Sequence, residues 1–126
     1  MDKIKRIVEE LGIAALETNM KIAAVAVVSD LGNLVFQTEN WDLSNQTNII
    51  LDAIKGNHSF VINNSEFSVV ETKAEGIIGT NNSGMGHVIF SRFQGGVLVV
   101  YAMPQADPPK VLEFLKIYAI KLNGKI

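Results

Sequence analysis

The sequence contains no cysteine among its 126 residues. This absence excludes a disulfide scaffold, a thiolate metal centre and a cysteine nucleophile. Neither sign of charge dominates, since 11 lysines and arginines stand against 13 aspartates and glutamates. A nucleic-acid-binding protein usually carries an excess of basic residues on one face. We therefore expect no nucleic-acid partner.

Long hydrophobic runs are also absent. An apolar run such as Ile22–Val28 is far shorter than the roughly 20 residues that cross a membrane. Residues Met1–Ile4 lack the basic and apolar regions with which a secretion signal begins. Hydrophobic residues make up 48% of the chain, which is enough for one buried core. We expect a single domain over residues 1–126, located in the cytoplasm and without membrane insertion.

Hydrophobic periodicity predicts helices at both ends of the chain and strands between them. Ile4, Val8, Leu11 and Ala15 recur at the spacing of one helical face. The valine-rich run after them is typical of a strand covered on both sides. The predicted elements are a first helix ending near Asn19, strands at 22–29 and 34–38, a helix at 44–55, strands at 59–62, 67–70, 76–79, 87–93 and 97–102, and a last helix after Asp107.

The second predicted helix has an unusually wide apolar face. Leu43, Thr47, Ile50 and Ile54 form one stripe along it, and Leu51 widens that stripe. The apolar arc covers roughly 200°, whereas packing on one side needs about 100°. We therefore expect this helix to pack on its own sheet and also on a second partner.

The last predicted helix is apolar around nearly its whole circumference. Its main stripe consists of residues 111, 115, 118 and 122, and Phe114, Ile117 and Ile120 extend the apolar character beyond that stripe. Condensed to helix, hairpin, helix, three-strand meander and helix, the order fits an α+β fold with three layers. A central antiparallel five-stranded sheet would carry the second helix on one face and the other two helices on the opposite face.

Two segments of this sequence resemble the hairpins of the roadblock/LC7 family, within the wider profilin-like and longin-like architecture. Residues Ala24–Phe36 look like the first hairpin of that family, and Val88–Tyr101 look like its last hairpin. The stretch Gly79–His87 also resembles a feature of archaeal members. The resemblance covers nearly the whole chain and implies the element order α-β-β-α-β-β-β-α.

The resemblance further implies a non-catalytic homodimer that binds a Ras-like small GTPase or scaffolds a complex. In that family the second helix and the third strand pair across the dimer axis. This chain has more residues between the helix and His87 than one strand needs, so either Ser59–Ile62 or Phe67–Val70 could form the paired edge. The dimer interface is predicted at Leu43, Thr47, Ile50, Leu51, Ile54, Phe67 and Val69.

Residues that could carry chemistry are few. The loop Thr80–His87 is rich in glycine and asparagine but has no Gly-Lys-Ser/Thr ending, so a simple connection between strands is the favoured interpretation. His58 and His87 have no partner at a metal-ligand spacing. We therefore expect no enzyme activity, no cofactor and no metal site.

Trp41 and Arg92 are the candidate contacts to a partner. Trp41 could anchor an interface, or it could pack as a staple at the start of the second helix. Arg92 could reach a carboxylate on a partner, or it could simply be solvated.

The rival hypothesis is a small-ligand sensor of the PAS or GAF type, with a pocket lined by Phe67, Phe90 and Tyr101. A small enzyme built on the Thr80–His87 loop is the third and least favoured alternative.

Overall fold

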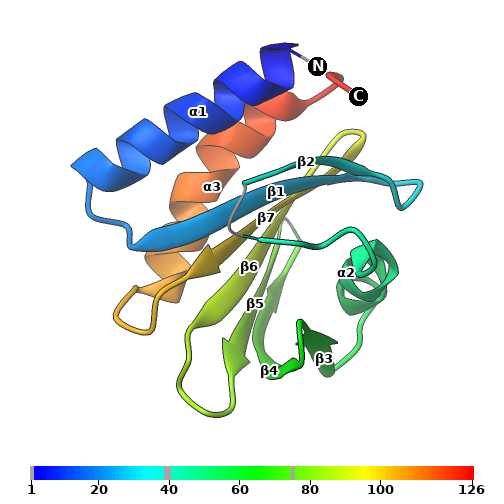
Figure 1. Cartoon of the computed structure of the whole chain (residues 1–126), viewed down its shortest axis with the longest axis vertical. Helices are drawn as coiled ribbons and strands as arrows, with labels where there is room; N and C mark the ends of the chain where they lie inside the picture. The colour runs from blue at the N-terminus through cyan, green and yellow to red at the C-terminus, as the bar shows by residue number, and fades with distance from the viewer. Residues whose placement is uncertain (1, 39–40, 75) are drawn as a thin grey trace.

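Seven strands form one antiparallel sheet in this protein (Figure 1). The computed structural model describes residues 2–38, 41–74 and 76–126. The strands are β1 (Ile22–Ser29), β2 (Leu34–Gln37), β3 (Ser59–Ile62), β4 (Ser65–Lys73), β5 (Gly76–Asn81), β6 (His87–Phe93) and β7 (Gly96–Ala102). Their order across the sheet is β2-β1-β7-β6-β5-β4-β3, so β1 from the beginning of the chain pairs with β7 from its end.

Helices cover both faces of the sheet. Helices α1 (Asp2–Glu17) and α3 (Pro108–Leu122) lie side by side on one face, and α2 (Thr47–Ile54) lies on the other (Figure 1). Each face has its own cluster of buried hydrophobic side chains. The α+β class and the predicted placement of the three helices are therefore confirmed. In the described part of the chain, no helix is long and apolar enough to cross a membrane.

The predicted count of five strands is wrong. Residues 59–73 form the hairpin β3–β4 around the two-residue turn Asn63–Asn64, where φ is 49° and 67°. Strand β4 also pairs with β5 along its length, so both strands of this hairpin belong to the sheet. Two short runs of β-branched and aromatic residues, separated by turn residues, predict such a hairpin. The residue patterns had indicated all seven strand segments, and the count fell to five when residues 59–102 were condensed to a three-strand meander.

Helix α2 is shorter than the predicted span of 44–55. Leu43 is fully buried, and its backbone N–H donates to Gln37 Oε1 at 2.9 Å, which holds the chain in a non-helical path. The Ser44 N–H donates to Asp42 Oδ1 at 3.1 Å, a local turn that competes with helix formation. The helix therefore begins only at Thr47.

Helix α3 packs closely against Gly76 on β5. A Cβ atom there would lie 2.4 Å from Phe90 O and 2.6 Å from Leu112 Cδ1. Replacing Gly76 with valine is expected to lower the free energy of unfolding by at least about 2 kcal/mol, because the clashing carbonyl belongs to a central strand. Urea denaturation measures this loss.

Gly12 on α1 provides the matched control for Gly76. A Cβ at Gly12 would meet no atom within 4 Å. Because glycine weakens a helix interior, Gly12→Ala is expected to raise the free energy of unfolding by about 0.5–1 kcal/mol. A valine at position 76 that left the urea midpoint unchanged would contradict this account of the α3 packing.

Candidate protein-binding surface

Helix α3 leaves part of its apolar circumference uncovered. Ile117 and Ile120 are 55% and 69% exposed. Seven residues of the helix are buried against the sheet and α1, namely Val111, Leu112, Phe114, Leu115, Tyr118, Ala119 and Leu122. Two large isoleucines on the solvent side of a helix therefore remain after the core has been satisfied, which is a common sign of a binding surface.

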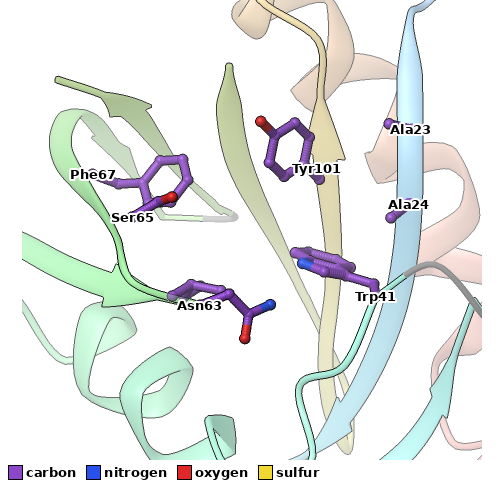
Figure 2. A pocket seen from close by; sticks show the side chains of 8 residues that line it. Ala23, Ala24, Trp41, Asn63, Ser65, Phe67 and Tyr101 are labelled. Atoms are coloured by element: carbon purple, nitrogen blue, oxygen red, sulfur yellow. The ribbon is translucent and has the colours of Figure 1, made fainter. Parts of the chain in front are cut away.

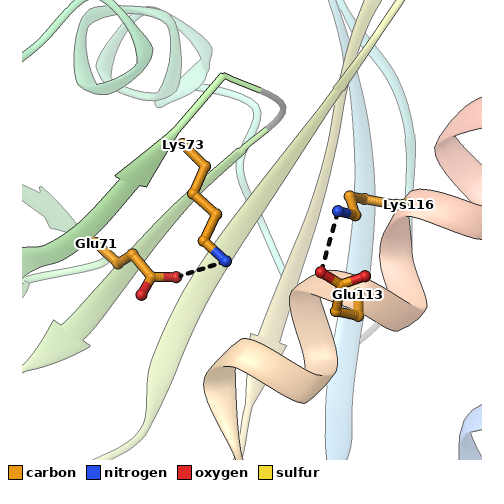
Figure 3. A network of polar contacts seen from close by, with 4 residues as sticks. All are labelled: Glu71, Lys73, Glu113 and Lys116. Carbon is orange, nitrogen blue, oxygen red and sulfur yellow. Dashed lines mark hydrogen bonds and ion pairs between the residues drawn. The ribbon is translucent and has the colours of Figure 1, made fainter.

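Two ion pairs, one on β4 and one on α3, lie on the face of the sheet that α3 covers. A register shift between Val69 and Glu71 places Glu71 opposite Ile78, a residue buried on the α3 face, so Glu71 and Lys73 share that face. Lys73 Nζ lies 3.5 Å from Glu71 Oε2, and on α3 Lys116 Nζ lies 3.1 Å from Glu113 Oε1. Figure 3 shows the two pairs extending toward one another from the strand and the helix.

A small cleft of about 140 Å³ lies between β6 and α3. Its lining includes Ser91, Arg92 and Lys116. Ser91 is fully buried, and its Oγ has no hydrogen-bond partner among the described residues. Arg92 is exposed, and it belongs to this lining although its register partner Val97 lies in the cluster of the α2 face. We call Lys73, Arg92, Glu113, Lys116, Ile117 and Ile120 the α3 surface. An apolar centre with a charged rim is typical of interfaces between proteins that associate and separate.

Comparison with known proteins identifies the family. No family model matches the sequence. Loki profilin-2 of Lokiarchaeum sp. (strain GC14_75) is 33% identical over 136 aligned positions, which cover 99% of this chain and 98% of that protein. The chain belongs to the profilin family. Loki profilin-1 of the same organism is 32% identical with the same coverage.

Solved structures agree with this membership. Loki profilin-2, in its complex with rabbit actin, superposes on this profilin with a TM-score of 0.88 at 33% identity, covering 100% of this chain and 99% of that one. Profilin of Schizosaccharomyces pombe has a TM-score of 0.71 at 17% identity, covering 85% of this chain and 88% of that one, and it shares the fold.

Membership in the profilin family overturns several predictions. The roadblock/LC7 assignment is wrong, because the relatives are profilins. The predicted homodimeric regulator of a Ras-like GTPase is also wrong, because structures of these relatives are complexes with actin. The PAS or GAF sensor is excluded on the same ground. Profilins are not enzymes, so the prediction of a non-enzymatic protein is confirmed. The resemblance was correct only at the level of the wider profilin-like architecture.

The residues predicted at a dimer interface lie in or against the core of this profilin. Leu43, Thr47, Ile50 and Phe67 are buried, and Leu51, Ile54 and Val69 are partly buried against the same cluster. The turn between β1 and β2 covers the flank of α2, since a Cβ at Gly32 would lie 3.7 Å from Leu51 Cδ1. The wide apolar arc of α2 is thus covered largely by the chain itself.

Trp41 is buried at 7% exposure and packs edge-on against Tyr101, with ring centroids 6.3 Å apart. Both rings line a cleft of about 260 Å³ with Phe67, as Figure 2 shows. Phe90 is fully buried and lies outside that lining, so only two of the three residues predicted for a ligand pocket meet there. Beside Trp41, the hydroxyl of Ser44 donates to Asp42 at 2.6 Å and lowers the pKa of that carboxyl group.

The loop before β6 connects β5 to β6 and is held by hydrogen bonds of Asn81. Asn81 is buried, and its Oδ1 accepts from the backbone N–H groups of Ser83 at 2.9 Å and Met85 at 3.1 Å. Its Nδ2 donates to Glu66 O at 3.0 Å, which fixes the loop to β4. These N–H groups are therefore used within the loop. Among the described residues, no group of three His, Cys, Asp or Glu side chains could hold a metal ion.

The sequence contains a signal for the α3 surface, although our prediction placed the interface on the second helix. Ile117 and Ile120 make the last helix apolar nearly all round, and a helix of that kind needs cover on every side. The apolar arc of the second helix, by contrast, is largely covered by the chain itself. Arg92 is the only residue predicted for a partner contact that lies on the α3 surface.

Proposed function

We propose that this profilin binds actin. The observation that carries the proposal is the complex of Loki profilin-2 with rabbit actin, since that protein matches 100% of this chain with a TM-score of 0.88. Loki profilin-1 also forms a complex with rabbit actin, and it is 31% identical to this chain. A binding protein without catalytic residues is consistent with the described surface, which offers contacts and no reactive centre.

The α3 surface is the site that we assign to actin. It combines Ile117 and Ile120 with a rim of charged side chains from β4, β6 and α3. The cleft at Ser91 forms a depression in this surface. Arg92 stands at this rim and keeps its proposed role in partner binding, whereas buried Trp41 has no such support from its position. Continuity of one sheet through residues 22–102 supports a single domain, and actin as partner supports a cytoplasmic location.

Binding to rabbit actin tests the proposal directly. The purified chain is titrated into monomeric actin and the heat of binding is measured, while sedimentation velocity gives the mass of the complex. We expect a saturable complex of one profilin with one actin. The absence of a complex in both measurements would contradict the proposed function.

A further inference from the structure

Strand β3 forms one edge of the sheet and pairs only with β4. In this antiparallel pair Val61 lies opposite Glu66, and Ser59 lies opposite Ser68. The carbonyl of Glu66 accepts from Asn82 N at 3.2 Å, so the backbone groups of Glu66 point away from β3. When two residues lie directly opposite each other in an antiparallel pair, their backbone N–H and C=O groups either both face the other strand or both face away from it. The N–H and C=O groups of Val61 and Ser59 are therefore directed outward at the sheet edge.

A groove of about 340 Å³ lies beside this edge. It is bounded by the N-terminal end of α2 and by the β3–β4 turn. Gln46 joins these two walls, because its Oε1 accepts from Asn63 N at 2.8 Å and its Nε2 donates to Asn63 Oδ1. The lining consists of four carboxamide side chains and two apolar ones: Asn45, Gln46, Asn63, Asn64, Ile49 and Val61.

The composition of the groove determines which kind of segment it can accept. No charged side chain lines it, so a charged group buried there would lose hydration without compensation. A carboxamide carries both donors and an acceptor, which match the N–H and C=O groups of a peptide bond, and those of Asn45 and Asn64 take no part in the contact between Gln46 and Asn63. Ile49 is partly buried and Val61 is 47% exposed, and both offer contacts to apolar side chains.

Protein sheets usually protect such an edge with charges, prolines or a covering segment. Strand β3 has the sequence Ser-Phe-Val-Ile, with neither a charge nor a proline. We propose that the groove along β3 binds an extended, uncharged peptide segment of a partner protein, which pairs with Val61 and Ser59 as an additional strand. This mode uses backbone hydrogen bonds for affinity and alternate side chains for selectivity. The site is separate from the α3 surface.

The test uses an acetylated and amidated peptide of alternating threonine and valine residues. Titration of the ¹⁵N-labelled full chain is followed by NMR. We expect chemical-shift changes along residues 59–64 and slower hydrogen exchange of the Val61 amide. Proline at position 61 removes an N–H group that β4 does not use, so Val61→Pro is expected to keep the fold and to weaken peptide binding by about tenfold or more. The thermal midpoint of the variant verifies the fold.

Two controls separate strand addition from other binding. Val61→Ile keeps both the N–H group and an apolar side chain, and it is expected to bind the peptide within about twofold of the original chain. A peptide that is N-methylated at alternate residues lacks the donors and is expected not to bind. Binding that Val61→Pro leaves unchanged, or no response of residues 59–64 to the peptide, would overturn the proposal. A protein that self-associates through this edge, with a mass that falls in Val61→Pro, would also overturn it.

Discussion

Replacing Ile120 with aspartate is expected to weaken the binding of actin by about a hundredfold. Ile120 is 69% exposed at the centre of the α3 surface, next to Ile117. An apolar side chain that forms a hot spot at the centre of an interface contributes about 2–4 kcal/mol, and the new carboxylate would in addition have to lose hydration in the complex. Calorimetric titration of monomeric actin measures the change in affinity.

Leu16→Asp is the matched control for this experiment. Leu16 is 82% exposed on α1, outside the α3 surface, so the variant introduces the same charge at another exposed aliphatic position. We expect Leu16→Asp to bind actin as the original chain does, and both variants to keep the original thermal midpoint. If Ile120→Asp binds normally, or if Leu16→Asp loses binding, actin occupies another surface.

Replacing Phe90 with alanine is expected to lower the free energy of unfolding by about 3–5 kcal/mol. Phe90 is fully buried on the α2 face of the central strand β6, and its ring lies 5.4 Å from that of Phe60. The cavity left by the ring would be difficult to fill, because β6 is paired with β5 on one side and with β7 on the other. These strands cannot move inward without disturbing their pairing. Urea denaturation followed by circular dichroism measures the loss.

Phe36→Ala tests whether burial causes this effect. Phe36 is only partly buried on the edge strand β2, so the same change in side chain should cost clearly less than it does at position 90. Equal losses at the two positions would show that the α2-face core is less tightly packed than the structure indicates.

Residue patterns predicted which faces of the helices are apolar, but they could not predict what covers each face. In α2 the wide arc is real, yet Leu51 packs toward the turn at Gly32 and Ile50 is buried in the cluster of the same face. In α3 the reverse holds, since Ile117 and Ile120 stay exposed although the helix looks like a core helix. Periodicity describes one element at a time, whereas cover depends on tertiary packing.

The strand count shows how simplifying a topology can discard a correct local prediction. The segments 59–62 and 67–70 were predicted as strands from their residues, and both belong to the sheet. Condensing residues 59–102 to a three-strand meander reduced the predicted sheet to five strands, the number that the roadblock-like order also implies. The surplus of chain before His87 was the observation that should have favoured the longer sheet. The groove at β3 follows from that second strand.

The pairing of β1 with β7 governs the order in which the protein can assemble during synthesis. Six of the eight residues of β1 are buried in the finished sheet, and one of them, Val27, lies opposite Leu98. A growing chain therefore presents this apolar strand long before its partner leaves the ribosome. The hairpin with β2 alone is too small to protect it. Closure of the sheet must wait for the last strand, which makes the nascent chain dependent on late, long-range contacts and exposes it to aggregation until then.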